Sequence, residues 1–350
     1  MPVAPAPSET ELAERLAART LELIDIPSES RSEAALAAHV ASELRDAVVE
    51  DLGDSCLLAY PREMRPRVLL AGHLDTVPAQ DNIPGRVQDG RVYGLGASDM
   101  KGALAVMMEL VLARAPYAAL FFPREELPSS ESALTPLLER SPVDAEFVVV
   151  MEPTNGELHA GCLGNINATW TFRGRSGHSA RPWDADNAIH RAAAGVSGLA
   201  AAEPLPVSFG DLVFTEVASV TKISGGIAMN VIPDVCTAHV NFRYAPGRTP
   251  LQAEERLREL TGGHGELVVD SNSGSAPVAL DHPLTQKLIQ AGSLTVAPKQ
   301  AWTPVAEFAA AGYPAVNFGP GATAQAHRRD EHVEIAALLK AHRVLEAFGT

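Results

Sequence analysis

The spacing of apolar residues changes along the chain and predicts which segments are helices and which are strands. In the first 165 residues, apolar positions three and four apart predict three helices, over residues 12–24, 34–47 and 102–115. Serine–glutamate capping patterns, Ser8 with Glu11 and Ser30 with Glu33, precede the first two. Short apolar runs predict three strands, over residues 68–74, 118–122 and 146–151. Strands that alternate with helices predict an α/β fold with a mixed, mostly parallel sheet.

The pattern is different between residues 166 and 271. It predicts the order strand, helix, strand, strand, helix, strand, over residues 166–174, 187–202, 220–226, 236–246, 250–260 and 265–271. This order is typical of a ferredoxin-like α+β unit. After residue 272 helices and strands alternate again, with a last helix from Val333. We therefore predict a larger domain formed by residues 1–165 and 272–350, with a smaller domain, residues 166–271, inserted into it.

Composition and charge exclude several functions. The formal net charge of −15 argues against a nucleic-acid-binding surface, which requires basic patches. No apolar run approaches the roughly 20 residues of a membrane helix, and the N-terminus lacks the pattern of a signal peptide. The three cysteines, Cys56, Cys162 and Cys236, form no C-x-x-C pair. We therefore expect a reduced, cytoplasmic protein without a membrane partner.

Polar residues that can bind metal follow the predicted strands of the larger domain. They are His73, Asp75, Asp99, Glu125, Glu126, Glu152 and His327. Ligands of open α/β sheets bind outside the carboxyl ends of the strands. So many acidic and imidazole groups at one edge would repel one another unless a cation neutralised them. The donors suit Zn²⁺, with Co²⁺ or Mn²⁺ as substitutes.

Each of these residues also has an ordinary structural explanation. His73 and Asp75 lie two positions apart on one strand face, so they form either a surface hydrogen bond or a metal ligand with its orienting carboxylate. A single acid after a strand is commonly a helix cap or a solvated charge. The segment "GLG" before Asp99 lacks the spacing of a phosphate-binding loop. The recurrence of such residues at successive strand ends favours the metal site.

The motifs resemble those of the M20 family of metallo-aminoacyl hydrolases. "GHLDTVP", "GLGASDMKGA", "REEL", "MEPT", "GRSGHSARPWDADNAIH", "NVIPDVCTAHVNFRYAP" and "AVNFGPG…AH" occur in the family's order over nearly the whole chain. The resemblance implies a zinc-peptidase-like catalytic domain with an inserted lid and dimerisation domain, and therefore a homodimer formed through the lid. It also implies an enzyme that hydrolyses linear amides and uses two divalent metal ions.

The resemblance also implies roles for individual residues. His73 and Glu152 would bind one ion, Glu126 and His327 the other, and Asp99 both, with a cis peptide bond between Asp99 and Met100. Asp75 would orient His73, and Glu125 would be the general acid and base. His178 matches a lid histidine that in relatives reaches the active site of the partner subunit. The candidates for substrate binding are Arg181, Gly225, Gly226, Asn230, Arg243 and Thr303.

Within the family, several segments most resemble desuccinylases, so the implied substrate is N-succinyl-LL-2,6-diaminopimelate. One segment departs from that pattern: Val305 and Glu307 stand where close desuccinylases carry an acid and an arginine. N-acetylornithine, another acyl amino acid or a dipeptide therefore remains an alternative substrate. A relative that has lost catalysis and only binds its ligand is the alternative outside the enzymes.

Overall fold

The computed structural model describes residues 8–141 and 143–349, which divide into two compact units. The first unit holds the described residues up to Gly161, Ala279–Ala297 and the described residues from Glu307 onward; the second holds Cys162–Val278 and Pro298–Ala306. None of the helices in the described part of the chain has the length and apolar content that a bilayer crossing requires. The start of the stretch inspected for a signal peptide, residues 1–7, lies outside the described residues.

The predicted domain boundaries lie a few residues from those of the two units. One further segment, residues 298–306, belongs to a different unit than predicted. The prediction placed residues 298–306 in the catalytic domain, but they pack with the second unit. The reason is local hydrogen bonding. The Leu163 N–H donates to the Ala301 carbonyl (3.0 Å), and the Gln300 side chain bonds both the N–H and the carbonyl of Thr215.

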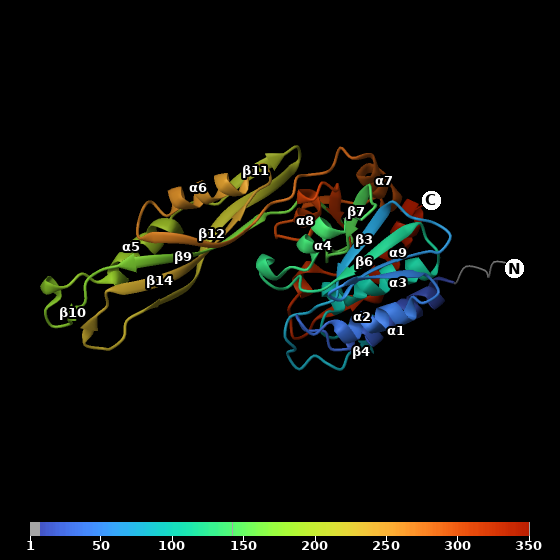
Figure 1. Cartoon of the computed structure of the whole chain (residues 1–350), viewed down its shortest axis with the longest axis horizontal. Coiled ribbons are helices and arrows are strands. Elements are labelled where there is room, and N and C mark those ends of the chain that lie inside the picture. Colours follow the sequence, from blue (N-terminus) through green and yellow to red (C-terminus); the bar gives the residue numbers. More distant parts are fainter. Residues whose placement is uncertain (1–7, 142, 350) are drawn as a thin grey trace. The chain divides into compact units, whose positions relative to one another are not determined.

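The first unit contains most of the helices (Figure 1). They are α1 (Glu9–Ile24), α2 (Ala34–Glu43), α3 (Gly102–Leu112), α4 (Leu134–Arg140), α7 (Pro283–Gly292), α8 (Val305–Ala310), which begins in the last segment of the second unit, and α9 (Ile335–Gly349). The short helical turns are η1 (Ala97–Lys101), η2 (Ser129–Glu131) and η4 (Thr323–Gln325). The predicted capping box at Ser8 and Glu11 is confirmed, with both of its hydrogen bonds present.

An eight-stranded sheet forms the centre of the first unit. Its order is β1 (Val48–Gly53), β2 (Cys56–Tyr60), β6 (Tyr117–Phe122), β3 (Val68–His73), β7 (Phe147–Val150), β17 (Ala315–Asn317), β8 (Leu158–Ala160) and β16 (Val296–Pro298). The neighbours β6, β3, β7 and β17 are parallel, whereas β1, β2 and β8 pair antiparallel. The predicted α/β fold with a mixed sheet and a parallel centre is confirmed.

Burial explains why the central strands were predictable. β6 and β7 are buried at every position and β3 at all but its first, because helices cover the sheet. Strands buried on both faces have continuous apolar sequences. Helix α3 packs on β3 and β6, and α1 and α9 pack against α3. A smaller sheet of β18 (His332–Glu334), β5 (Arg91–Tyr93) and β4 (Arg86–Gln88) completes this unit.

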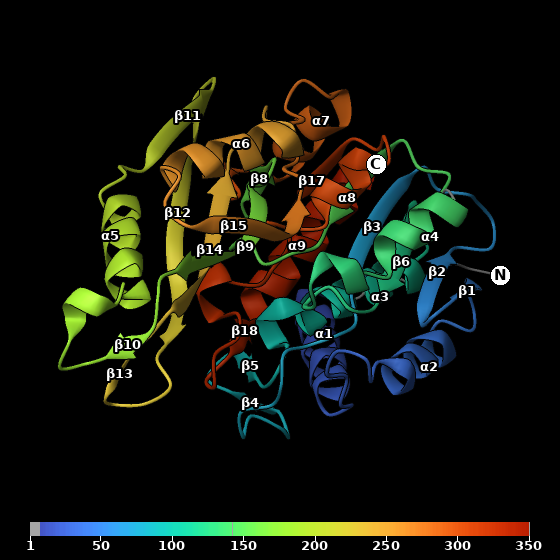
Figure 2. The same ribbon diagram turned by 60° about the vertical axis from the view of Figure 1, so that its left-hand side comes forward.

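The second unit has a five-stranded sheet covered by the helices α5 and α6, and a separate two-stranded sheet of β10 and β13 (Figure 2). Its strands are β9 (Gly164–Arg173), β10 (Gly177–His178), β11 (Leu205–Phe209), β12 (Leu212–Gly225), β13 (Val231–Ile232), β14 (Val235–Tyr244) and β15 (Glu266–Ser273); its helices are η3 (Pro182–Asp184), α5 (Ala188–Ala200) and α6 (Pro250–Leu260). The sheet order β11-β12-β14-β9-β15 is antiparallel throughout. Without β11, its connections are those of the ferredoxin-like unit that the pattern predicted.

Alternating burial along β9 and β14 gives this second sheet one covered and one open face. Inward residues such as Trp170 and Phe172 pack with Ala192 of α5 and Leu257 of α6. Asn241 and its neighbours on the same face are only half-buried. The open face is therefore the one that can present polar side chains.

Candidate active site

Three neighbouring strands of the first unit carry polar side chains at or just beyond their carboxyl ends. His73 is the last residue of β3, Glu125 and Glu126 follow β6, and Glu152 follows β7. Because β6, β3 and β7 are adjacent and parallel, these side chains reach the same edge of the sheet.

Asp99 and His327 join them from two loops. Asp99 lies in η1, directly before α3, and the Asp99–Met100 peptide bond is cis, as predicted. Asp99 Oδ1 is 3.1 Å from His73 Nε2, and Asp99 Oδ2 is 3.6 Å from His327 Nε2. The two oxygens of Asp99 thus face two different imidazoles.

The five predicted metal ligands come together as two groups that share Asp99. One group is His73, Asp99 and Glu152, and the other is Asp99, Glu126 and His327; within each group the ligand atoms lie within 4.8 Å of one another. His327 Nε2 lies 2.9 Å from Glu126 Oε1, and His73 Nε2 lies 3.9 Å from Glu152 Oε1. That these groups bind metal stays a prediction for the individual residues.

The electrostatics of the cluster fit bound cations. Burial raises the pKa of Glu125 well above its usual 4.5, and the charge of Glu152 raises it further. The hydrogen bond with Glu126 raises the pKa of His327 to about 9. For His73, burial opposes the charged form, but hydrogen bonds with Asp75 and Asp99 raise its pKa well above 6.5. The cluster therefore retains protons to offset its excess negative charge, a task that divalent cations also perform.

Asp75 connects two of the strand ends rather than only orienting His73. It is fully buried, and its carboxylate accepts the N–H groups of Glu125 (3.0 Å) and Glu126 (3.1 Å) and the hydroxyl of Ser30 (2.8 Å). His73 Nδ1 is closer to the carbonyl oxygen of Asp75 (2.9 Å) than to its carboxylate (3.5 Å). Asp75 therefore fixes the start of the loop that carries Glu125 and Glu126.

Ser30 was predicted to cap the helix over 34–47, and this prediction is wrong. The residue at the N-cap of α2 is Glu33, whose side chain makes no capping bond, and the Ser30 hydroxyl bonds Asp75 instead. The chain turns at Arg31, whose φ is 76°, so the helix begins after Glu33 and Ser30 lies outside its first turn.

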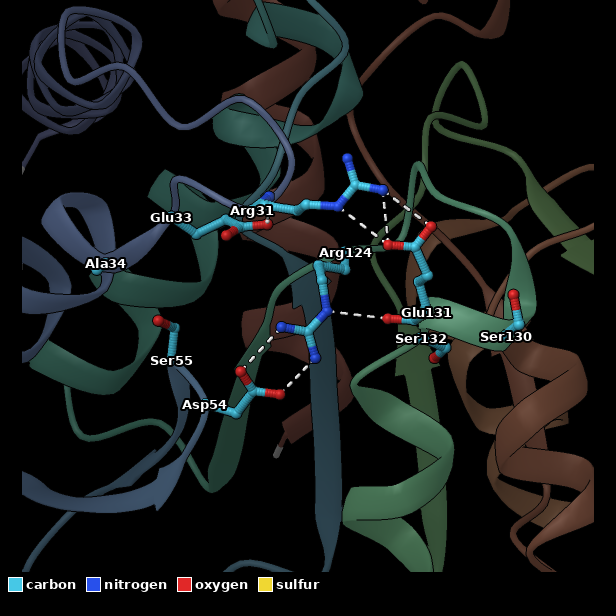
Figure 3. Close-up of a pocket in the computed structure, with 9 residues that line it drawn as sticks. All are labelled: Arg31, Glu33, Ala34, Asp54, Ser55, Arg124, Ser130, Glu131 and Ser132. Carbon is cyan, nitrogen blue, oxygen red and sulfur yellow. Dashed lines mark hydrogen bonds and ion pairs between the residues drawn. The ribbon is translucent and has the colours of Figure 1, made fainter.

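A polar pocket lies beside the loop that carries the two glutamates (Figure 3). The guanidinium of Arg124, the residue before Glu125, forms a two-point ion pair with Asp54, and its Nε donates to the Glu131 carbonyl (2.9 Å). Arg31 pairs in the same way with the Glu131 carboxylate, with Nε–Oε2 and Nη2–Oε1 distances of 3.0 and 2.9 Å. Since each arginine is matched by an acid, the pocket anchors the loop rather than collecting an anion.

The predicted lid residues all lie in the second unit, where they fall into two groups. The strands β10 and β13 pair His178 with Val231, and the Ser179 N–H donates to the Asn230 carbonyl (3.0 Å). The Arg181 N–H donates to the His178 carbonyl (2.8 Å). His178, Arg181 and Asn230 therefore form one exposed group, close in sequence to Gly226 with its φ of 90°.

Arg243 lies far from that group along the same strand. Gly225 pairs with Cys236 of β14, and Arg243 is seven residues further along. At about 3.3 Å per residue this is roughly 23 Å, longer than a small substrate. Arg243 is half-buried, and its Nε donates to Asn241 Oδ1 (2.9 Å). Thr303 is buried in the segment 298–306, where its carbonyl accepts a weak bond from the Cys162 thiol.

Val305 and Glu307, which depart from the desuccinylase pattern, both pack within the structure. Val305 is fully buried. The Glu307 carboxylate accepts the hydroxyls of Ser132 (2.6 Å) and Thr135 (2.5 Å), which follow the loop that carries Glu125 and Glu126. In this chain, position 307 therefore supports the start of α4.

A mixed sheet with imidazole and carboxylate groups gathered at the carboxyl ends of its parallel strands is an arrangement that suits a metal-dependent hydrolase. Residues 69–349 match the model of Peptidase family M20/M25/M40, and the chain belongs to this family. The family and the class of metal-dependent amidohydrolase, predicted from the motifs, are confirmed.

The chain is 36% identical over 346 residues to the succinyl-diaminopimelate desuccinylase of Corynebacterium glutamicum, covering 92% of this chain and 94% of that protein. It is 31% identical over 312 residues to the N-acetyl-L-citrulline deacetylase of Xanthomonas campestris, covering 83% of each. Among solved structures, a tripeptidase from Staphylococcus aureus superposes with a TM-score of 0.78 at 21% identity, covering 96% of this chain and 98% of the tripeptidase. This last likeness establishes the fold alone.

Proposed function

We propose that this chain is a two-metal hydrolase that cleaves the amide bond of N-succinyl-LL-2,6-diaminopimelate to succinate and LL-diaminopimelate. The observation that carries the proposal is the pair of ligand groups sharing Asp99, in a chain 36% identical to a succinyl-diaminopimelate desuccinylase. His73 and Glu152 would hold one ion, Glu126 and His327 the other, and Asp99 both. Zn²⁺ suits these donors best, and Co²⁺ or Mn²⁺ could replace it.

When bound, the ions would polarise the amide carbonyl and lower the pKa of water towards neutrality. Glu125 is proposed to carry the proton. Its carboxylate accepts a proton from the attacking water and returns it to the nitrogen of the departing amine, so no proton is gained or lost. The pKa of Glu125, raised by burial and then by the charge of Glu152, brings the carboxyl closer to the neutral range that such a double role requires.

His178 is proposed to stabilise the negative oxygen of the tetrahedral intermediate. The Ala180 N–H donates to His178 Nδ1 (3.1 Å). A neutral imidazole whose Nδ1 accepts a hydrogen bond carries its proton on Nε2. Nε2 is therefore the donor that an oxyanion requires.

We propose a homodimer formed through the second unit. Cys236, which pairs with Gly225 at the end of the sheet next to Gly226 and Asn230, lies roughly 23 Å from Arg243 along β14, too far for both ends to surround one small substrate within a single chain. Two copies could bring one group from each chain to each site. We propose that Arg243, Asn230, Arg181, Thr303, Gly225 and Gly226 bind the substrate in this way.

Two features of the second unit support this interface. Ile227, Met229 and Trp183 expose most of their side chains. Among the described residues, β11 pairs with β12 only over Leu212–Glu216, so that 217–225 forms an open strand edge. Exposed apolar side chains and an open edge are features of surfaces that pair with another chain.

A panel of substrates tests the proposed reaction. The purified protein, loaded with Zn²⁺, is assayed with N-succinyl-LL-diaminopimelate, N-acetylornithine, N-acetylcitrulline and simple dipeptides, with and without a chelator. We expect the succinyl substrate to have the highest kcat/KM and the chelator to abolish turnover. A preference for an acetyl substrate would favour the deacetylase alternative, which the 31% identity to an N-acetyl-L-citrulline deacetylase supports. Bound metal without turnover on any substrate would favour a binding protein.

We also propose a cytoplasmic setting for this reaction. Cys56, Cys162 and Cys236 are free and buried. Unpaired cysteines are the usual state in a reducing compartment.

A further inference from the structure

One buried carboxylate near the site has no role in the proposed mechanism. Glu331 precedes β18 and is 2% exposed. Its Oε1 accepts the N–H groups of Ser98 (2.9 Å) and Asp99 (2.9 Å), and its Oε2 accepts the N–H of Gly96 (3.0 Å). Its main-chain carbonyl also accepts the N–H of Gly94 (3.0 Å). Four donors from one loop therefore converge on a single residue.

These contacts join two loops that carry predicted metal ligands. The 94–99 loop holds Asp99, the residue shared by both ligand groups, and Glu331 is four positions after His327. Glu331 is not a member of any ligand group formed by the described residues. Its contacts with the ions would therefore run through Asp99 rather than through a bond of its own.

We propose that Glu331 is a positioning residue that fixes the backbone of Asp99 relative to His327, and so sets the affinity of the ion held by Asp99, Glu126 and His327. The inference rests on the proposed two-metal function. The other ion should depend less on Glu331, because His73 ends β3 and Glu152 follows β7, which the sheet itself holds in place.

The chemistry of the carboxylate makes the role testable without changing the size of the side chain. A carboxylate offers acceptors on both oxygens, which suits donors on both sides. In Glu331→Gln, one oxygen is replaced by an NH₂ group that faces an N–H donor, so at least one of the three bonds to the loop is lost. Glu331→Asp keeps the charge but withdraws it by one methylene.

The experiment measures binding of Zn²⁺ alone by competition with a chelating dye, for wild type, Glu331→Gln and Glu331→Asp. Glu334→Gln is the matched control, because Glu334 lies on the adjoining strand with its carboxylate exposed and paired with Arg91. Loss of a group that orients a metal ligand typically weakens metal binding about 10- to 100-fold. We expect that loss for one of the two ions in Glu331→Gln, a smaller change for the other, and none in the control.

Amide hydrogen exchange of the metal-free proteins gives a second reading that needs no ion. We expect faster exchange at Gly96, Ser98 and Asp99 in Glu331→Gln than in wild type. If Glu331→Gln does not fold, Glu331→Asp serves for both measurements. Two ions bound with wild-type affinity by the folded variant would overturn the proposal, even if the variant melted at a lower temperature. A wild-type protein that bound no second ion would instead overturn the proposed two-metal function, and with it this inference.

Discussion

Glu125 and Glu126 have the same side chain and follow the same strand, yet their surroundings differ. Glu126 Oε1 lies 2.9 Å from His327 Nε2, in a ligand group with Asp99. Glu125 lies near Glu152 and His73, and its pKa is raised by burial and by the charge of Glu152. Glu125 and Glu126 could also hold one ion together with His73, so the separate roles proposed for them need a matched pair of variants as a test.

Glu125→Gln should keep both metal ions and lose turnover, because it removes only the proposed proton carrier. General acid–base groups typically contribute about 10²–10⁴ in rate, so kcat should fall by that factor. Glu126→Gln should instead lower the amount of bound metal. Metal analysis and steady-state kinetics on both variants check this. Normal turnover by Glu125→Gln would remove Glu125 from the mechanism.

His342 of α9 is a buried polar residue that lowers the stability of the fold. Its ring is 4% exposed, and neither ring nitrogen has a hydrogen-bond partner among the described residues. Burial lowers its pKa below 6.5, although the charges of Glu346 and Glu109 oppose the shift. The unfolded chain therefore takes up a proton at a pH where the folded protein does not. The free energy of unfolding is therefore not reduced by this titration above pH 6.5, and it falls as the pH drops from 6.5 towards the lower pKa of the folded state.

His342→Leu should stabilise the protein, since it removes a buried polar group of similar size. The gain should be about 1 kcal/mol above pH 6.5 and larger below it. Denaturant unfolding on both sides of that pH measures the difference, with the exposed His190→Asn as control. A gain that did not grow on acidification would contradict the assigned cause.

At the scale of elements, side-chain contacts hold the loop after β6 in place. Arg124 ties the loop to Asp54 and to the Glu131 carbonyl, while Asp75 holds the N–H groups of Glu125 and Glu126. The loop is therefore fixed both at the glutamates and at its far end.

Arg124→Met should lower kcat with little change in KM, because it frees the far end of this loop without touching the substrate. A displacement of catalytic groups by about 1 Å can cost about 10²-fold, so we expect a loss of between 10- and 100-fold. Arg114→Met, which removes an exposed arginine paired with Glu63, is the matched control. Kinetics and melting temperatures of both variants separate loop positioning from general stability. Equal kcat values in the two variants would argue that the Asp75 contacts suffice.

The sequence predicted those strands whose residues are buried either continuously or at every second position. β6 and β7 are apolar throughout, β3 is apolar up to His73, and β9 and β14 alternate, so both kinds of strand were found. The hairpin of β1 and β2 was missed, and the preceding helix was predicted to run to residue 47 although it ends at Glu43. Asp54 and Ser55 both take positive φ in the hairpin turn, without the Asn-Gly or Asp-Gly pair that marks such turns.

The candidate ligands stood out in the sequence because residues that can bind metal recur after successive strands, and the resemblance to the family then assigned their roles. The supporting residues carried no such signal. Glu331 accepts an N–H from a residue 235 positions earlier, and Arg124 pairs with Asp54 across 70 positions. Ser30 matched a helix cap in sequence, but the fold brings it to Asp75. Contacts of this kind depend on the tertiary structure and have no local pattern.

At the scale of the whole molecule, the division of the chain into two units raises the question of which copy of the chain completes each site. All metal-ligand candidates lie in the first unit, and His178 lies in the second. In the proposed homodimer, His178 of one chain serves the site of the other. This arrangement makes a prediction that a monomeric enzyme cannot satisfy.

Two inactive variants should restore activity when they are mixed. Glu125→Gln and His178→Ala are each expected to be nearly inactive alone. In a mixed dimer, the His178→Ala chain keeps Glu125 and receives an intact His178 from the other chain, so one of its two sites is complete. Unfolding and refolding the two variants together in equal amounts should therefore give about a quarter of the wild-type activity, because half of the dimers are mixed. If His178 served the site of its own chain, no mixed dimer would contain a complete site and the mixture would stay inactive. Each variant refolded alone is the control.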